Sequence, residues 1–424
     1  MIKDKEVANI IAAEEYRQKH ILRMVPSTNE VSDDVLESIG SVFTNCYSEG
    51  AVGKRYYQGQ ENTDKIEQLC IERAKKAFNL PEDWHVNVQA LSGSPANLAV
   101  YFALCNPGDS VVGLGLNSGG HLTHGHRVSI TGDLFTVHQF DVDINTSLID
   151  YDSLENFVCN VHPKMMIIGT TAYSRIIDWK RIRDIANKAV CYFVADVAHV
   201  AGLIVGGAYP SPVPYADVVT MTTHKTLRGA RGALILCRNE LAKRIDRSVF
   251  PYLQGGPHMN NIAGIAVALK EAMSDEFKNY AEQSVKNAKK LASILSDIYG
   301  LKIVSGGTDS HLMVVDLTPK NIDGKTAAIA LEKAGIECNC STIPFDPNPP
   351  ARPSGIRLGT PVLTTIGMNE DDMLEVAAYI NRALDNVDND SVLEAIKNDI
   401  AKFVSSVRNR DPEVDGHKQL ELPF

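Results

Sequence analysis

The central part of the chain alternates short apolar runs with stretches of helical periodicity. That periodicity is clearest at residues 97–104, 151–158 and 179–189. The apolar runs, which we expect to be strands, lie at residues 86–90, 110–114, 134–139, 164–169, 191–195, 218–221 and 233–237. Because most runs are apolar at successive positions, both faces of each strand should be covered. The pattern predicts an α/β fold with a mostly parallel, seven-stranded sheet between two layers of helices.

Outside this region the pattern is mainly helical. Residues 1–20 and 64–79 have the periodicity of amphipathic helices, and residues 260–298 predict a long helical connection. A smaller α/β pattern begins near residue 304, and helices at residues 370–384 and 391–407 close the chain. We therefore expect three parts, namely an N-terminal arm at residues 1–50, a large domain at residues 51–275 and a small C-terminal domain at residues 276–424.

One segment does not fit a monomeric core. Residues 41–60 are polar and rich in glycine, and they include Tyr47, Tyr56 and Tyr57. A segment of this composition either wraps around another subunit or lines a cleft. The sequence pattern alone leaves both possibilities open.

Composition narrows the class of protein. The chain has 424 residues, of which 44% are apolar and 22% are charged, as expected for a globular protein with a large core. Its formal charge of −10 disfavours nucleic acid and anionic membranes as partners. No apolar run reaches the roughly 18 residues that a membrane helix needs. The eight cysteines are scattered without a CxxC pair, which favours reduced thiols and a cytoplasmic location.

Two charged side chains follow neighbouring expected strands. Asp196 comes directly after the run at residues 191–195, and Lys225 comes shortly after the run at residues 218–221. Each alone has an ordinary structural explanation, because carboxylates cap helices and lysines occur at strand ends. Together they suit pyridoxal phosphate, whose aldehyde bonds to a lysine amine and whose pyridine nitrogen pairs with a carboxylate. Ligands of such sheets bind at the carboxyl ends of the strands.

A phosphate site is expected at Ser92-Gly93-Ser94, which follows one expected strand and opens a helix. Free N–H groups, the helix dipole and two hydroxyls would favour an anion there. Pro95 is expected at the first helical position, where its missing N–H has no cost. An ordinary helix cap explains this motif equally well.

Three histidines, His121, His124 and His126, invite comparison with a metal site. Their glycine-rich loop supplies no carboxylate or thiolate at a usable spacing. We therefore expect no metal there.

These features occur within a longer series of motifs that resembles the serine hydroxymethyltransferase family. The resemblance runs in family order from about residue 21 to residue 361. It is carried by Tyr47-Ser-Glu-Gly, Gly53-Lys-Arg-Tyr-Tyr57, Ser92-Gly-Ser94, Gly119-Gly-His121-Leu-Thr-His-Gly125, Asp196-Val-Ala-His199-Val-Ala-Gly202, Thr223-His-Lys225-Thr, Gln254-Gly-Gly256-Pro, Ser305-Gly-Gly-Thr-Asp and Ser354-Gly-Ile-Arg357. It implies the aspartate-aminotransferase-like fold of pyridoxal 5′-phosphate enzymes, with tetrahydrofolate as co-substrate.

The resemblance also implies roles for individual residues. Catalytic residues would be Lys225, Glu49, Asp196, His121 and His224, with His121 stacked on the cofactor ring and Glu49 moving protons. Cofactor contacts would be Ser92, Gly93, Ser94, His121, Ser174, Asp196, His199, Lys225, Tyr47, Gly255 and Gly256. Substrate contacts would be Ser27, Glu49, Tyr57, Arg231 and Arg357, the last gripping the carboxylate. Folate contacts would be Tyr56, Leu116, Gly120, Leu122 and Ser341.

The folate region is where the chain departs most from the family pattern. The family's Glu-Gly-Tyr-Pro-Gly reads Glu49-Gly-Ala51-Val52-Gly53 here, and Ser341 stands where the family has asparagine. Serine cannot match both the donor and the acceptor of an asparagine amide. The sequence therefore predicts weakened folate binding.

The main hypothesis is reversible one-carbon transfer between L-serine and tetrahydrofolate in a homodimer with shared active sites, or in a tetramer of two such dimers. A folate-independent aldolase or transaldolase, or an α-methylserine hydroxymethyltransferase, is the nearest alternative. A non-catalytic regulator that binds an amino acid or RNA is disfavoured, because a binder needs no such set of lysine, aspartate, histidine and arginine.

Overall fold

The computed structural model describes residues 2–410, which form two compact units. One unit consists of residues 29–282, and the other combines residues 1–28 with residues 283–424. The expected small domain thus extends, at residues 411–424, beyond the described part of the chain. The three-part division expected from the sequence stays a prediction. In the structure the first 28 residues group with the C-terminal part, because an N-terminal strand pairs with it.

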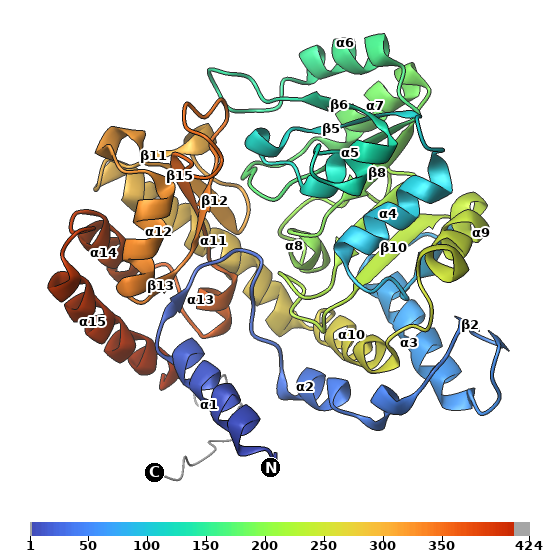
Figure 1. Cartoon of the computed structure of the whole chain (residues 1–424), viewed down its shortest axis with the longest axis horizontal. Helices are drawn as coiled ribbons and strands as arrows, with labels where there is room; N and C mark the ends of the chain where they lie inside the picture. The colour runs from blue at the N-terminus through green and yellow to red at the C-terminus, as the bar shows by residue number, and fades with distance from the viewer. Residues whose placement is uncertain (1, 411–424) are drawn as a thin grey trace. The chain divides into compact units, whose positions relative to one another are not determined.

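The unit of residues 29–282 is built on a seven-stranded sheet, which confirms the expected α/β fold (Figure 1). Its strand order is β4-β10-β9-β8-β7-β5-β6. The pairs from β9 to β6 are parallel, whereas β10 runs antiparallel to both β4 and β9. The strands are β4 (Trp84–Asn87), β5 (Ser110–Leu114), β6 (Thr136–Phe140), β7 (Met165–Gly169), β8 (Tyr192–Asp196), β9 (Val218–Thr222) and β10 (Ala233–Arg238).

Two expected strands differ from the observed ones by two residues or more at an end. The run at residues 134–139 begins as a strand only at Thr136, because Leu134 ends the short helix α5 (Ile130–Leu134), which Ser129 caps. The run at residues 86–90 corresponds to β4, which ends at Asn87. Apolar character extends past the hydrogen-bonded ladder in both cases, because neighbouring turns are also buried.

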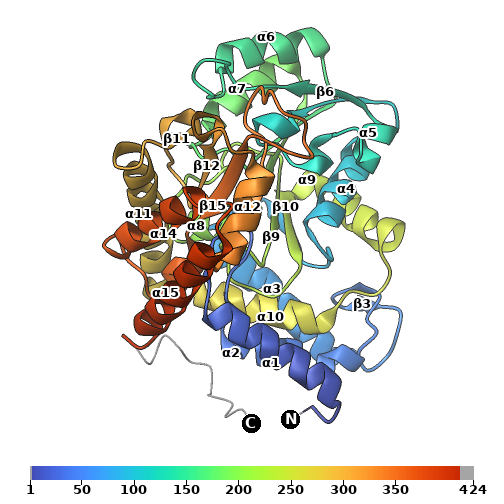
Figure 2. The same cartoon turned by 60° about the vertical axis from the view of Figure 1, so that its left-hand side comes forward.

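Helices of this unit pack on the sheet and on one another. Helix α4 packs against β9 and β10, and α6 packs against α7. Helices α2 and α3 both lie against α10 (Figures 1 and 2). The helices are α2 (Asp33–Ile39), α3 (Glu61–Ala77), α4 (Gly93–Leu104), α5, α6 (Tyr151–Val161), α7 (Trp179–Ala189), α8 (Ala201–Val205), α9 (Asn239–Arg247) and α10 (Met259–Glu271). A small hairpin, β2 (Gly50–Ala51) and β3 (Lys54–Arg55), precedes α3.

The expected long helical connection at residues 260–298 is two helices in the structure. Helix α10 ends at Glu271, and α11 (Asp275–Asp297) begins after a short turn. The boundary between the two units falls within α11.

The other unit contains a four-stranded antiparallel sheet of order β11-β12-β15-β14. A separate parallel pair joins β1 (Leu22–Arg23) to β13 (Ile336–Glu337). The remaining strands are β11 (Lys302–Ile303), β12 (Leu312–Asp316), β14 (Asn339–Ser341) and β15 (Gly355–Gly359). Its helices are α1 (Lys5–Lys19), α12 (Gly324–Lys333), α13 (Pro361–Thr365), α14 (Asp372–Leu384) and α15 (Asp390–Arg408).

Burial explains why the larger sheet can position a site. All five residues of β7 and all five of β9 are buried, so both faces of these strands are covered. The smaller unit has its own apolar core, in which Met313 and Ile356 of its sheet meet Leu331 and Ile380 of its helices. Across residues 2–410, no helix combines the length and apolar character that crossing a membrane requires.

Candidate active site

Lys225 lies just beyond the end of β9, as the sequence predicts. Thr223 turns the chain there, because its hydroxyl donates to the carbonyl of Ala230 at 2.6 Å and its own carbonyl accepts from the N–H of Gly229 at 2.7 Å. The carbonyl of Lys225 accepts a hydrogen bond from Asn29 Nδ2 at 3.1 Å. The lysine is therefore carried on a loop that is fixed at both ends.

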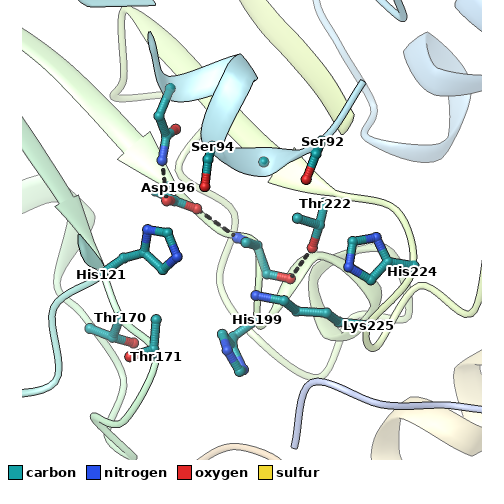
Figure 3. A pocket seen from close by; sticks show the side chains of 13 residues that line it. Ser92, Ser94, His121, Thr170, Thr171, Asp196, His199, Thr222, His224 and Lys225 are labelled. Carbon is teal, nitrogen blue, oxygen red and sulfur yellow. Dashed lines mark hydrogen bonds between the residues drawn. The ribbon is translucent and has the colours of Figure 1, made fainter. Parts of the chain in front are cut away.

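Lys225 lines a cavity of about 160 Å³ at the carboxyl ends of the parallel strands (Figure 3). Eight of the predicted site residues surround this cavity, which we call the lysine pocket: Ser92, Gly93, Ser94, His121, Asp196, His199, His224 and Lys225. Five further residues complete its wall, namely Asn97, Thr170, Thr171, Ala198 and Thr222. The motifs from four separate strand ends thus meet in one place.

Asp196 ends β8 and is buried beside this pocket. Its Oδ2 accepts hydrogen bonds from Asn97 Nδ2 at 2.8 Å and from His124 Nε2 at 2.9 Å, and its Oδ1 accepts from the N–H of Ala198 at 3.0 Å. Burial opposes the charged form, but the hydrogen bonds that His124 and Asn97 donate outweigh it and hold the pKa of Asp196 well below its usual range. The carboxylate is therefore ionised at neutral pH.

Of the site residues that sequence reasoning missed, His124 and Asn97 are the two whose side chains contact Asp196. His124 is fully buried, and its Nδ1 accepts from the N–H of His121 at 3.2 Å, which leaves the proton on Nε2 for Asp196. Asn97 also donates to Thr123 at 2.8 Å and accepts from Thr220 at 2.7 Å. The sequence did contain a signal for Asn97. It lies one helical turn after Gly93, so it should lie on the same face of the helix as the expected phosphate site.

Two histidines of the pocket are uncharged at neutral pH. Burial lowers the pKa of His121 to about 4, with a smaller opposing effect from Asp196. Burial also lowers the pKa of His224 to about 4, and the nearby positive charges of Arg231 and Lys225 act in the same direction. His121 is fixed by a contact of 2.7 Å between its Nδ1 and the Thr123 hydroxyl. A neutral, fixed imidazole is suited to stacking on a flat ring.

The first turn of α4 fits the phosphate group of pyridoxal phosphate. Ser92 is the N-cap residue, yet its side chain makes no capping hydrogen bond within the helix. A side chain at Gly93 would place its Cβ 2.6 Å from Thr222 Cγ2, so glycine keeps this approach open. Pro95 is the third helical residue, not the first as expected. The N–H at the third position of a helix also has no partner within the helix, so proline loses no hydrogen bond there. The donor set, the buried anionic Asp196 and the adjoining lysine together match the parts of the cofactor.

A second hollow of about 520 Å³ is lined by three more predicted residues, Glu49, Tyr56 and Gly255. Its wall consists of Glu49, Tyr56, Phe250, Pro251, Tyr252, Leu253, Gln254 and Gly255, and we call it the Glu49 hollow. The Tyr57 hydroxyl donates to Glu49 Oε2 at 2.7 Å, and this hydrogen bond raises the pKa of Tyr57. The Tyr47 ring lies close to Gly256, where an added Cβ would meet its Cε1 at 3.3 Å.

No residue lines both cavities, so one chain presents the predicted site as two separate groups. Eight predicted residues of this unit line neither cavity, namely Tyr47, Tyr57, Leu116, Gly120, Leu122, Ser174, Arg231 and Gly256. Gly120 has a packing reason for being glycine, because an added Cβ would lie 1.9 Å from the carbonyl of Leu114. Among residues 2–410, no group of three metal-ligating side chains exists.

Ser27, Ser341 and Arg357 belong to the other unit. Arg357 is half-buried on β15, and its Nε donates to Asn339 Oδ1 at 3.0 Å. Burial lowers the pKa of Arg357 to about 10, so the guanidinium stays charged at neutral pH. Ser341 lies on the neighbouring strand β14 and donates to the carbonyl of Thr342 at 3.1 Å.

Comparison with known proteins agrees with this geometry. The family described as serine hydroxymethyltransferase matches residues 1–380. The chain is 50% identical over 402 residues to the serine hydroxymethyltransferase of Acidobacterium capsulatum, which covers 95% of this chain and 93% of that protein. It is 48% identical over 397 residues to the enzyme of the same name from Desulfotalea psychrophila, which covers 94% and 92% respectively.

The lowered histidine pKa values predict a pH-dependent stability. Between pH 6.5, the ordinary histidine pKa, and about 4, the unfolded chain binds protons at His121 and His224 that the folded chain does not. Stability should therefore fall as pH falls through this range. We expect His224→Gln to reduce the drop in thermal unfolding midpoint between pH 7.5 and pH 5, measured by calorimetry.

The matched control is His162→Asn, which replaces an exposed histidine in a left-handed backbone position that asparagine tolerates. It should leave the pH dependence of the midpoint unchanged. An unchanged drop in the His224→Gln variant would contradict the assignment of a neutral His224.

Proposed function

The chain belongs to the serine hydroxymethyltransferase family, and on this premise we propose that it transfers a one-carbon unit reversibly between L-serine and tetrahydrofolate, giving glycine. It is a pyridoxal phosphate-dependent hydroxymethyltransferase, with tetrahydrofolate as the co-substrate. The observation that carries the assignment of residues is the convergence of Lys225, Asp196 and His121 on one pocket. No observation favours the folate-independent aldolase or the non-catalytic regulator.

The residues of the lysine pocket would hold the cofactor as follows. The N–H groups and hydroxyls of Ser92 and Ser94 would hold the phosphate at the beginning of α4. The Asp196 carboxylate would hold the pyridine nitrogen in its protonated form, and Lys225 would supply the amine for covalent attachment. His121 would cover one ring face, while His199 and Ser174 would contact the phenolic oxygen. When bound, pyridoxal phosphate supplies an electron sink for the α-carbon of the amino acid.

The substrate would be held and deprotonated by the residues that the family resemblance singles out. Arg357, which is charged and partly desolvated, would bind the amino acid carboxylate with Ser27 and Tyr57. Glu49 would take the proton from the serine hydroxyl as the one-carbon unit departs, and it would return a proton in the reverse direction. Its hydrogen bond with Tyr57 fixes one carboxylate oxygen and leaves the other available. Arg231 and His224 would complete the surroundings of the substrate.

Tetrahydrofolate would bind with fewer contacts than the family pattern provides. Tyr56 lies in the Glu49 hollow with its ring exposed, and Leu122 is also exposed, so both offer apolar surface to a flat ligand. Leu116 and Gly120 would lie beside that ligand. Ser341 has a short hydroxyl arm that bonds to its own strand end, so it would contact the pterin less well than an asparagine amide.

The active site would be completed by a second copy of the chain. Glu49 and Gly255, which the resemblance assigns to catalysis and to the cofactor, line the Glu49 hollow, and neither lines the lysine pocket of the same chain. Large exposed apolar side chains occur in the same region, including Val42, Tyr47, Tyr56 and Tyr252. Gly255 and Gly256 of one subunit would reach the phosphate held by the other. A dimer, or a tetramer of two such dimers, follows.

A cytoplasmic location fits the thiol chemistry of the chain. All eight cysteines are free, and several of them are buried in apolar surroundings. Burial raises the pKa of Cys237 to about 12, so this thiol is unreactive at neutral pH. Free buried thiols are typical of proteins that work in a reducing compartment.

Replacement of Lys225 by alanine tests the covalent role. Lys225→Ala should lower serine turnover by at least about 1,000-fold, because covalent catalysis at this amine is lost. The visible absorbance of the bound cofactor should also lose its sensitivity to borohydride. Lys243→Ala, which removes an exposed lysine of α9, is the control and should behave as the parent. Turnover by Lys225→Ala at the parent rate would show that the amine has no covalent role.

The folate site can be tested by restoring the family residue. Ser341→Asn should tighten tetrahydrofolate binding by about two- to tenfold, the usual value of one polar contact. The measurement is the glycine-dependent absorbance of the bound cofactor, titrated with tetrahydrofolate. Ser341→Ala should not tighten binding, since it adds no polar group. Equal affinities of the parent and Ser341→Asn would mean that residue 341 does not contact folate.

Subunit mixing tests whether active sites are shared. Chains carrying Glu49→Gln and chains carrying Lys225→Ala should each turn over serine far more slowly than the parent, because each lacks one essential group. Mixed dimers have one site with both groups intact, so a random mixture should regain about a quarter of the parent activity. Sedimentation at the assay concentration would establish that mixed dimers form. No recovery in a mixture that contains them would place Glu49 and Lys225 in the site of a single chain.

A further inference from the structure

Glu49 lies at the base of a hairpin too small to be stable alone. Strands β2 and β3 have two residues each, and they pair Gly50 with Arg55 and Ala51 with Lys54. The N–H of Tyr56 donates to the carbonyl of Glu49 at 3.1 Å and extends this ladder by one bond. Isolated two-stranded hairpins are marginally stable in water at best. Something outside the hairpin must therefore hold it.

The Arg55 side chain supplies this support, and it is only 2% exposed. One guanidinium nitrogen, Nη1, donates to the carbonyl of Ser48 at 2.9 Å and to the carbonyl of Gly50 at 3.1 Å. These two carbonyls lie on either side of Glu49 in the sequence. The backbone that carries the Glu49 side chain is thus held from both directions by one group.

The other two guanidinium nitrogens fasten Arg55 to helix α3. Nε donates to Asp64 Oδ1 at 2.8 Å, and Nη2 donates to Glu67 Oε2 at 2.5 Å. Asp64 and Glu67 are three residues apart, so they share one face of the helix. Asp64 also accepts from the N–H of Gly53, in the turn of the hairpin, at 3.0 Å.

A second residue closes the arrangement from the large sheet. Gln89, which follows β4 and is buried, donates through Nε2 to the carbonyl of Gly50 at 2.9 Å and to Glu67 Oε1 at 2.8 Å. The buried Glu67 therefore has a partner for each oxygen. Gly50 itself has φ +104, and an added Cβ would lie 2.3 Å from the carbonyl of Lys54, so the hairpin requires glycine there.

We infer that Arg55 is a positioning residue for hydroxymethyl transfer, because it clamps the backbone on both sides of Glu49 to helix α3 and so sets where the Glu49 carboxylate lies. The inference rests on the proton-transfer role proposed for Glu49. Lysine cannot replace arginine in this clamp. Its single ammonium is a point charge that cannot reach two carbonyls and two carboxylates in the fixed directions of a guanidinium fork.

The decisive experiment is a double-mutant cycle on the holoenzyme. Arg55→Lys should lower kcat for serine by about 10- to 100-fold, as a displacement of roughly 1 Å does to a positioned group. The KM for serine should change little, because Glu49 acts on the reacting hydroxyl. In a Glu49→Gln background, Arg55→Lys should lower kcat further by less than about twofold, because both changes act through one carboxylate.

Arg183→Lys is the matched control. Arg183 also holds two backbone carbonyls and one carboxylate, those of Tyr215, Cys191 and Asp217, but it lines neither cavity. It should lower the thermal midpoint to a similar degree as Arg55→Lys while leaving kcat near the parent value. Equal losses of kcat in the two variants would assign Arg55 a general structural role and overturn the inference.

Hydrogen exchange gives a readout that does not depend on activity. In Arg55→Lys the Tyr56 amide should exchange faster than in the parent, whereas in Glu49→Gln it should be unchanged, because that amide bonds to the backbone of residue 49. The inference would be overturned if the Tyr56 amide of Arg55→Lys exchanged at the parent rate. It would also be overturned if the kcat loss of the double variant equalled the product of the losses in Arg55→Lys and Glu49→Gln. An unaltered kcat in Glu49→Gln alone would instead remove the proposed role of Glu49, and the positioning role would fall with it.

Discussion

The buried negative charge of Asp196 is the constraint on which the site depends. A carboxylate removed from water is strongly destabilising unless donors surround it. Here the donors come from the helix after β4, from the loop after β5 and from the backbone after β8, through Asn97, His124 and Ala198. Satisfying one charge therefore fixes three segments of the large sheet relative to one another. The pocket walls are placed by the same bonds that keep the carboxylate ionised.

Much of the architecture could be predicted because it depends on local pattern. Continuous apolar runs identified the seven strands, and the rule that ligands bind at strand ends singled out Lys225 and Asp196 before any geometry was known. Strand ends were less certain, as at Leu134, because burial continues through turns that leave the ladder. Helix starts were similarly displaced, since α4 begins two residues before Pro95.

Other features could not be read from the sequence because they depend on contacts between distant segments. From the sequence, His124 was considered only as a possible metal ligand, whereas in the structure its bond to Asp196 joins residues 72 positions apart. Asn97 and Thr220, 123 positions apart, meet only after β9 has been placed beside β8. The grouping of residues 1–28 with the C-terminal unit likewise follows from the pairing of β1 with β13, which no periodicity encodes.

The attachment of the hairpin to α3 has a consequence for how this region could vary in length. Arg55 contacts Asp64 and Glu67, which both lie in the first two turns of α3. These contacts depend on the number of residues between the hairpin and the helix. Inserting one residue into the first turn before Asp64 would rotate both carboxylates by about 100° around the helix axis, away from the guanidinium. Exposed residues of the hairpin, such as Lys54, can be substituted, but the number of residues between the hairpin and Asp64 cannot change without breaking these contacts. Loop-grafting and insertion libraries for this enzyme are therefore better directed to the exposed turn around Asn145 than to the segment between the hairpin and α3.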